Sequence, residues 1–439
     1  MSDARLPLSK LLQAAGRAFA SMRAEGLGLQ GALAAAGAKL PPSERGALQA
    51  ILYDAVRRRA LAEAALEALT EHPPKEPVRS ILTVALALVF SGTYKDFTLA
   101  DQTVRALRAD PKTARAAGFA NAVLRRAMRE RSELAAKLEA RDDVRYNVPA
   151  WWLARVQAAW PENWREVLEP ARSRPPMTLR INRRRTDMET YRAKLDEAGM
   201  AHRVLGPEAL MLEAPVPVES VPGFAEGLVS VQDAGVQLAA HFLPVKPGDR
   251  VLDACAAPGG KTAHLLELVD CRMTALEIDP DRARRIEETL SRLGLKAEIL
   301  TADAAATDLW WDKEPFDAVL LDAPCTASGI VRRQPDVPWN RRPVDIRALA
   351  REQARLLKAL WPLVKKGGHL LFVTCSIFPE EGPEQVSRFL AETPDAENVP
   401  LAPGLDGMMR LIPLARDTSP DGIEPAVHDG FFYALFRKA

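Results

Sequence analysis

Apolar residues recur at three- and four-residue intervals through the first 140 residues, as Leu48, Ile51 and Leu52 illustrate. This period places them on one face of a helix. Proline breaks the pattern at three places: Pro41-Pro42, Pro73-Pro74 and Asp110-Pro111. Because proline lacks the amide hydrogen that a helix needs and restricts the residue before it, these sites separate helices. We therefore predict an all-helical domain at residues 1–144.

The pattern changes between residues 145 and 240. A strand-like run spans Met177 to Asn182, and a second spans Ala209 to Leu212. The stretch from Ala214 to Gly223 carries prolines and a glycine, which is typical of a surface connection. We predict a small α/β module at 145–240.

Beyond residue 241, short apolar runs alternate with amphipathic stretches, which predicts βαβ units and a parallel sheet at 241–439. Helices are expected to begin near Lys261 and Pro280, the second ending before Gly294. The strand candidates are Arg250 to Cys255, Arg272 to Ile278, Ala297 to Leu300, Phe316 to Asp322 and His369 to Cys375.

Composition adds limits to this outline. Hydrophobic residues make up 47% and charged residues 27%, as in soluble globular proteins. No apolar run is long enough to span a membrane and the first residues do not resemble a signal peptide, so we expect a cytoplasmic protein. The four cysteines show no C-x-x-C spacing, so neither disulfides nor a metal site are predicted.

Charge is segregated along the chain. Residues 1–145 hold 23 Lys and Arg against 16 Asp and Glu, although the whole chain has a net charge of only +1. A basic front end is compatible with a polyanionic partner, but charges on a helical face are more often merely solvated.

Val251 to Lys261 reads V-L-D-A-C-A-A-P-G-G-K, a strand that runs into a glycine-bearing turn and then a helix. The glycines allow close backbone approach, and amides at the helix start suit a ligand carboxylate. The run is neither G-x-G-x-x-G nor a phosphate-binding loop. Glu277, at the end of the second strand, can accept hydrogen bonds from a ribose. Asp303 follows the third strand; alone it would be read as a turn former.

Asp322 and Cys325 end the fourth predicted strand, and Cys375 ends the fifth. Two thiols and a carboxylate should therefore meet at the carboxyl edge of the sheet, where ligands bind. A thiolate is a strong nucleophile, but spacing alone does not rank the two cysteines. Cys271 is expected to pack as a small hydrophobe.

A basic segment with one aromatic residue lies between these strands, and its guanidiniums and indole suit phosphates and an unstacked base. The candidate RNA-binding residues are Arg332, Arg333, Trp339, Arg341 and Arg342.

Together, the strings D-A-C-A-A-P-G-G-K, L-D-A-P-C-T-A-S-G, R-R-Q-P-D and T-C-S resemble the Sun/Fmu (RsmB-like) RNA cytosine-5 methyltransferases. The likeness extends to Ser230-Val-Gln-Asp-Ala and Asp429-Gly-Phe-Phe-Tyr. It implies a C-terminal Rossmann-like class I methyltransferase domain that uses S-adenosylmethionine. The implied cofactor contacts are Cys255, Ala256, Ala257, Pro258, Gly259, Gly260, Lys261, Glu277, Asp303 and Asp322. Glu277 stands where relatives commonly have Asp.

The resemblance also implies residue roles. Carbon 5 of cytosine accepts a methyl group only after a thiolate has added to carbon 6, and the base must be single-stranded or extruded. Cys375 would be that nucleophile, Cys325 would assist product release, and Asp322 would hydrogen-bond near the ring's N3 and N4.

The N-terminal segment, especially Phe119-Ala-Asn-Ala-Val-Leu-Arg-Arg, resembles the NusB-like RNA-binding domain of the bacterial small-subunit members. It favours 16S ribosomal RNA, free or in an early assembly particle, as the partner, and we expect a monomer. The alternatives are a tRNA cytosine-5 methyltransferase and a noncatalytic RNA-binding assembly factor.

Overall fold

The computed structural model describes residues 6–416 and 424–439. It divides into two compact units, which we call the helical unit and the sheet unit. The helical unit comprises Met1–Ala158 with Arg333–Arg342, and the sheet unit comprises Ala159–Arg332 with Pro343–Ala439. The sequence predicted three consecutive ranges, 1–144, 145–240 and 241–439. It did not predict that residues 333–342 would group with the N-terminal helices. In the described residues, no helix has the length and apolar character needed to cross a membrane.

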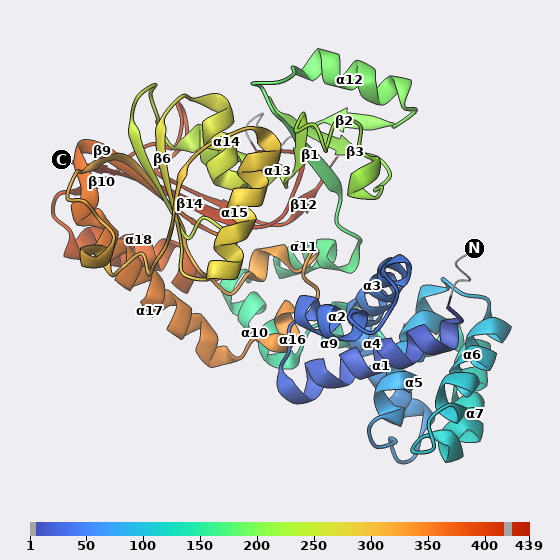
Figure 1. Cartoon of the computed structure of the whole chain (residues 1–439). Coiled ribbons are helices and arrows are strands. Elements are labelled where there is room, and N and C mark those ends of the chain that lie inside the picture. Colours follow the sequence, from blue (N-terminus) through green and yellow to red (C-terminus); the bar gives the residue numbers. More distant parts are fainter. Residues whose placement is uncertain (1–5, 417–423) are drawn as a thin grey trace. The chain divides into compact units, whose positions relative to one another are not determined.

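The helical unit is built around one buried helix, α5 (Val78–Ser91) (Figure 1). This helix is apolar on nearly all sides, as expected for the centre of a bundle. Helices α1 (Leu8–Glu25), α3 (Pro42–Arg57) and α4 (Arg59–Leu69) pack against it. The remaining helices are α2 (Leu29–Gly37), α6 (Asp96–Arg108), α7 (Ala117–Arg129), α8 (Arg131–Leu138), α9 (Asp142–Arg145) and α10 (Ala150–Ala159). The proline breaks fall between helices, as predicted.

The segment 333–342 completes this unit. It contains the short helix α16 (Val337–Asn340). The Asp336 carboxylate accepts a hydrogen bond from the Leu29 amide at 2.8 Å, at the start of α2. The Arg59 guanidinium lies over the Trp339 ring, 4.3 Å from its centre. Both contacts join residues far apart in the sequence.

The sheet unit begins with a small antiparallel sheet in the order β2-β3-β1-β4. Its strands are β1 (Met177–Ile181), β2 (His202–Val204), β3 (Ala209–Leu212) and β4 (Val229–Val231). Helix α12 (Met188–Glu197) lies beside it, and Tyr191 and Leu195 are buried in its core. The two strands predicted from the sequence, β1 and β3, are paired neighbours.

The large sheet has the order β10-β14-β9-β8-β5-β6-β7. Its parallel strands are β5 (Arg250–Ala254), β6 (Arg272–Glu277), β7 (Glu298–Thr301), β8 (Phe316–Asp322) and β9 (Val364–Thr374). The sequence predicted these five strands. It did not predict β14 (Phe431–Lys438), which pairs antiparallel with β9, or β10 (Ala396–Asn398) and β11 (Met408–Leu411), which pair with β14.

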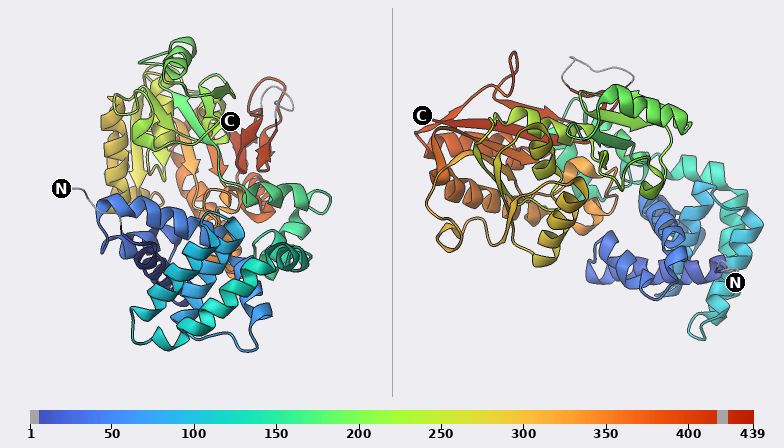
Figure 2. Two further views of the ribbon diagram at one scale, coloured as in Figure 1. Left: turned by 90° about the vertical axis from the view of Figure 1, so that its right-hand side faces the viewer. Right: turned by 45° about the horizontal axis from the view of Figure 1, so that its top comes forward.

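Helices cover both faces of the large sheet (Figure 2). One face carries α13 (Ala234–Phe242), α14 (Gly260–Leu268) and α15 (Pro280–Leu293), and the other carries α17 (Pro343–Leu360) and α18 (Pro383–Glu392). Successive residues alternate between the two cores: Val251 faces the first and Leu252 the second. This sandwich leaves the carboxyl ends of the parallel strands to form the site.

Candidate active site

A glycine turn links β5 to α14. Gly259 has φ 93° and lies directly before the helix, a conformation that other residues rarely adopt. A Cβ atom there would also lie 3.2 Å from the Ile286 Cα. Glycine therefore lets the turn pass close to α15 while the amides at the start of α14 face the strand ends.

Two carboxylates flank this turn. Lys261 Nζ donates to Asp322 Oδ2 at 2.6 Å, which joins the start of α14 to the end of β8. Asp253 is buried on β5 and accepts a hydrogen bond from Thr262 Oγ1 at 2.5 Å. Burial raises the pKa of Asp253 to about 7, although the Thr262 hydrogen bond opposes this shift.

Glu277 has the properties expected of a ribose-binding acid. It is only 2% exposed, and its Oε1 accepts hydrogen bonds from the Asp279 amide and the Arg282 guanidinium. Among the described residues, Oε2 has no hydrogen-bond partner, although it is buried. Buried carboxylate oxygens without partners are costly, so a ligand hydroxyl would fit this position.

Asp303 is positioned differently. Arg355 donates to both of its carboxylate oxygens at 3.0 Å, and this hydrogen bonding holds the pKa of Asp303 below its usual value. An adenine amino group at Asp303 would therefore have to share the carboxylate with Arg355.

Cys325 and Cys375 are brought together, as the sequence predicted. Their Sγ atoms lie 3.3 Å apart. The hydrogen bond to Cys375 and burial both raise the pKa of Cys325, and the negative charge of Glu381 adds to this effect. Burial also raises the pKa of Cys271, to about 11, in accord with a packing role. The structure thus brings the Cys325 and Cys375 thiols together at the ends of two adjacent strands.

The expectation of a surface role for Arg332 is wrong. This residue is 2% exposed, and its guanidinium donates to Asp429 Oδ1 and to the His428 carbonyl, each at 2.9 Å. Sequence proximity to Arg333 suggested a shared surface, but the partner that buries Arg332 lies 97 residues away. Arg342 is exposed, and Arg333, Trp339 and Arg341 are partly exposed.

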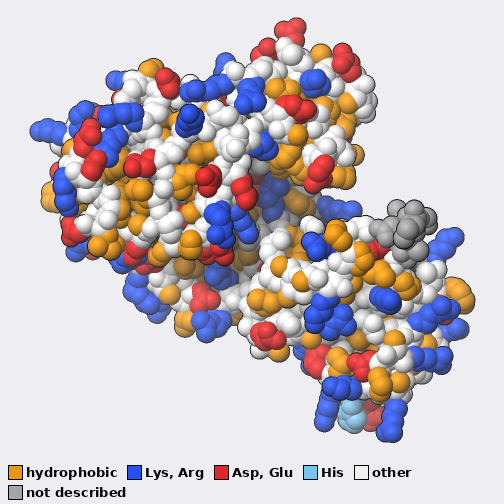
Figure 3. Space-filling model, in the orientation of Figure 1, with side chains coloured by type: hydrophobic (Ala, Val, Ile, Leu, Met, Phe, Trp, Pro, Cys, Tyr) orange, Lys and Arg blue, Asp and Glu red, His pale blue; other side chains and the backbone are white. Residues whose placement is uncertain are grey.

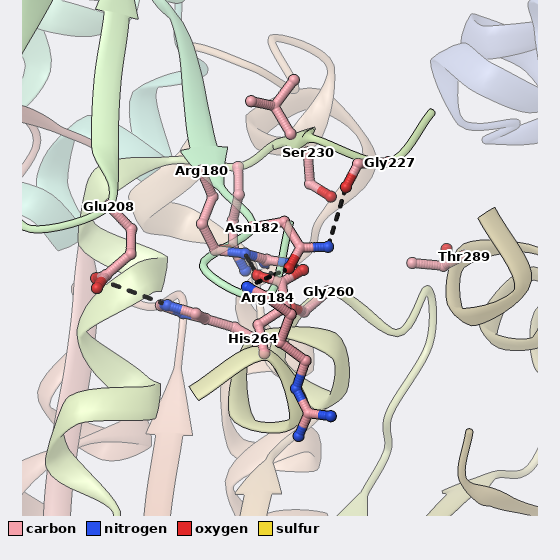
Figure 4. A network of polar contacts seen from close by, with 12 residues as sticks. Arg180, Asn182, Arg184, Glu208, Gly227, Ser230, Gly260, His264 and Thr289 are labelled. Atoms are coloured by element: carbon pink, nitrogen blue, oxygen red, sulfur yellow. Dashed lines mark hydrogen bonds and ion pairs between the residues drawn. The ribbon is translucent and has the colours of Figure 1, made fainter. Parts of the chain in front are cut away.

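The sequence analysis did not predict a buried network of hydrogen bonds at the glycine turn between β5 and α14. Arg180 on β1 donates to the Gly260 carbonyl at 2.8 Å and to Gln232 Oε1 at 2.6 Å (Figure 4). It also forms two 2.8 Å hydrogen bonds with the Glu267 carboxylate on α14. A charged residue in an otherwise uncharged and mostly apolar strand was the available signal. The network ties the small sheet to the turn that precedes α14.

A second polar cluster lies beside this network. The Glu208 carboxylate contacts His241 Nε2 at 2.8 Å. It also lies 3.9 Å from His264 Nε2 (Figure 4). Its other oxygen accepts a hydrogen bond from Arg183 at 3.0 Å. Because a guanidinium already balances the carboxylate charge, we assign the cluster no ligand.

Comparison with known proteins identifies the family. The model described as 16S rRNA methyltransferase RsmB/F matches residues 240–437, its ferredoxin-like domain matches 148–219, and the NusB family matches 9–129. Ribosomal RNA small subunit methyltransferase B of Pseudomonas putida is 40% identical over 97% of this chain and 98% of its own length. The chain belongs to the RsmB/F family.

Further relatives of the RsmB/F enzyme agree with this assignment. The Vibrio cholerae methyltransferase B is 39% identical over 94% of both chains. The crystal structure of PH0851 is 26% identical, with a TM-score of 0.77 over 99% of both chains. The enzyme class inferred from the motifs is therefore confirmed: this RsmB/F protein is a methyltransferase with S-adenosylmethionine as its cofactor.

Proposed function

We propose that this chain methylates carbon 5 of a cytosine in 16S ribosomal RNA, with Cys375 as the covalent nucleophile. The observation that carries the proposal is the pair of thiols 3.3 Å apart at the ends of adjacent strands, beside the Lys261–Asp322 ion pair. The NusB match at residues 9–129 and the names of the relatives support ribosomal RNA over tRNA.

The proposed chemistry uses these groups in sequence. The Cys375 thiolate adds to carbon 6, which makes carbon 5 electron-rich. When bound, S-adenosylmethionine supplies the electrophilic methyl group. Loss of the carbon 5 proton then restores the ring and expels Cys375, with Cys325 assisting release. Asp322 hydrogen-bonds the ring near N3 and N4.

We assign the cofactor contacts from the family motifs that these residues match. We place the carboxylate of S-adenosylmethionine at the turn that includes residues 255–261 and its ribose at Glu277, whose Oε2 lacks a partner among the described residues. Asp303 is assigned to the adenine.

Basic side chains would bind the RNA backbone. We assign Arg333, Arg341 and Arg342 to phosphate contacts, and Lys and Arg side chains are also spread over the visible face of the helical unit, with acidic ones among them (Figure 3). We propose three functional modules, at 1–144, 145–240 and 241–439, with residues 333–342 packed into the first. One chain can supply every named site residue, so we propose a monomer. We also propose that it acts in the cytoplasm, on free 16S RNA or an early assembly particle.

The test is methylation of separated RNA pools with labelled S-adenosylmethionine, followed by mapping of 5-methylcytosine. We expect label in 16S RNA with the native chain and none with Cys375→Ala, which should still bind the cofactor. Label confined to tRNA would refute the substrate. Cofactor binding without label in any pool would favour an assembly factor, and turnover by Cys375→Ala would refute the nucleophile.

A further inference from the structure

Glu381 is a buried carboxylate that lies between the two cysteine-bearing loops. It ends the short 3₁₀ turn Pro379–Glu381, directly before α18, and is 0% exposed. The motifs that identified the cysteines did not single it out. It is not among the residues assigned above to the nucleophile, to product release or to the cofactor.

Each oxygen of this carboxylate is held by hydrogen bonds. Oε1 accepts from the Thr326 amide at 2.9 Å and from Gln353 Nε2 at 3.2 Å. Oε2 accepts from Ser376 Oγ at 2.6 Å and from Thr326 Oγ1 at 2.5 Å. Thr326 follows Cys325 and Ser376 follows Cys375, so one side chain is bonded to the neighbour of each thiol.

Two further contacts extend the connection to the residues before the cysteines. Gln353 Nε2 also donates to the Pro324 carbonyl at 2.9 Å. Thr374 Oγ1 donates to the Glu381 backbone carbonyl at 3.1 Å. Both cysteines are therefore flanked on each side by residues bonded to Glu381 or to its partner Gln353.

The physical consequence is rigidity. Hydrogen bonds to a buried charged acceptor are stronger than neutral ones, and leaving such an acceptor or its donors unpaired is costly. The loops after β8 and β9 thus have a common attachment that resists independent movement. Displacing either loop would break bonds to the same carboxylate.

We propose that Glu381 is a positioning residue that holds the Cys325 and Cys375 thiols at their reactive separation. The inference rests on the proposed covalent mechanism and deepens it. Glu381 touches neither the RNA base nor the cofactor in this role; it acts through Thr326 and Ser376.

The charge of Glu381 contributes a second effect on the same pair. It raises the pKa of Cys325, together with the hydrogen bond to Cys375 and burial. Cys325 is thereby kept as a thiol, able to donate toward the Cys375 sulfur. Burial raises the pKa of Glu381 itself, but its four donors oppose that shift.

Two substitutions distinguish the effect of the length of the Glu381 side chain from the effect of its charge. Glu381→Gln keeps the length, and the Ser376 and Thr326 hydroxyls can rotate to accept from the new amide. Glu381→Asp keeps the charge but is one methylene shorter, so it cannot reach both loops. Glu384→Gln is the matched control, because Glu384 is exposed on the same stretch of chain.

We expect kcat to fall about 100-fold in Glu381→Asp, the scale of a 1 Å misplacement of reacting groups, and less in Glu381→Gln. KM for RNA and the affinity for S-adenosylmethionine should stay near the native values, as should all parameters of Glu384→Gln. Turnover of Glu381→Asp near the native rate, or better than that of Glu381→Gln, would overturn the proposal. So would a loss confined to KM or cofactor affinity.

A measurement that needs no RNA tests the positioning role of Glu381 independently of the covalent mechanism. Alkylation of Cys325 by iodoacetamide, followed by mass spectrometry, should be several-fold faster in Glu381→Asp, because the loosened loops expose the buried thiol. If Cys375→Ala retains activity, the mechanism fails, but unchanged alkylation rates would refute the positioning role independently. If Glu381→Asp does not fold, Ser376→Ala replaces it, with a lower kcat at unchanged KM as the expected result and a native kcat as the refuting one.

Discussion

At the scale of single residues, Cys325 and Cys375 have different surroundings although their sulfur atoms are in contact. Cys325 is buried, and its hydrogen bond to Cys375 and its burial raise its pKa. Cys375 is partly exposed at the end of β9. Only the second thiol is accessible to a large substrate, which agrees with the order of roles implied by the T-C-S motif.

This asymmetry predicts the behaviour of Cys325→Ala. The variant should form the covalent bond between Cys375 and RNA but release product slowly, so a protein–RNA adduct should accumulate. Denaturing gel electrophoresis after incubation with RNA and cofactor detects the adduct. Cys271→Ala is the control, since Cys271 lies away from the pair and should give none. Normal product release by Cys325→Ala would contradict its assigned role.

Asp253 gives a prediction about pH. Burial raises its pKa to about 7, so the folded protein favours the protonated carboxyl. Its contribution to stability is complete below its unfolded pKa near 4 and is lost as pH rises to about 7. Relative to Asp253→Asn, the native chain should therefore lose up to about 4 kcal/mol of unfolding free energy over this range. Urea unfolding at pH 5 and pH 8 captures about 3 kcal/mol of this loss, because part of it has already occurred by pH 5; parallel pH dependences would exclude the effect.

The sequence was enough to predict which residues lie close together when those residues are at the ends of parallel strands. Cys325, Cys375 and Asp322 could be placed together because parallel strands share one carboxyl edge. Arg332 was assigned to RNA binding although it is buried, and Glu381 was not assigned at all, because the contacts of both depend on partners brought close only by folding. A basic residue in a basic segment carries no sequence signal that it will be buried against Asp429.

At the scale of elements, the network around Arg180 connects the small sheet to α14. The Arg180 and Glu267 side chains are 0% and 1% exposed, so neither charge is screened by water. Arg180 also bonds to the carbonyl of Gly260, at the first residue of α14. The small sheet is therefore bonded directly to the glycine turn between β5 and α14.

We predict that Arg180→Met destabilises the protein by about 3–5 kcal/mol, because it leaves the Glu267 charge buried and uncompensated. Cofactor affinity should fall as the turn loses its bond to β1. Chemical denaturation and equilibrium binding test both effects. Adding Glu267→Leu should recover much of the stability but not the affinity, whereas equal recovery of both would argue against a role at the turn.

The burial pattern of β14 explains why the sequence did not predict this strand. Its residues Phe431 to Phe436 are all buried, since helices cover both faces of the sheet, and so they lack the alternation of a half-exposed strand. A short apolar run of this kind does not reveal its pairing direction. Four of the five parallel strands were easier to predict because an amphipathic helix follows each of them; β7 is followed only by the short turn Thr307–Leu309.

At the scale of the whole molecule, the helical unit depends on residues 333–342. The Asp336 carboxylate accepts the Leu29 amide at 2.8 Å and also the Asn340 side-chain amide at 2.8 Å. The first of these satisfies an amide at the start of α2, where the helix itself offers no acceptor.

Asp336→Ala should therefore destabilise the helical unit by about 1–2 kcal/mol, the usual cost of removing such a cap. Scanning calorimetry of the full chain should show its transition lowered by about 2–4 °C for each kcal/mol lost. Asp308→Ala, in an exposed position of the sheet unit, should leave that transition unchanged. An unshifted transition in Asp336→Ala would show that the contact adds little.

The discontinuous helical unit also has a consequence for biosynthesis. A nascent chain leaves the ribosome with its N-terminus first, and domains generally fold as units in that order. Here the Leu29 amide and the Arg59 guanidinium are made long before Asp336 and Trp339. The first unit to be translated thus acquires its last contacts only after strands β5 to β8 of the methyltransferase sheet have emerged. A gene fusion that moved this unit elsewhere would have to carry both of its separated coding segments.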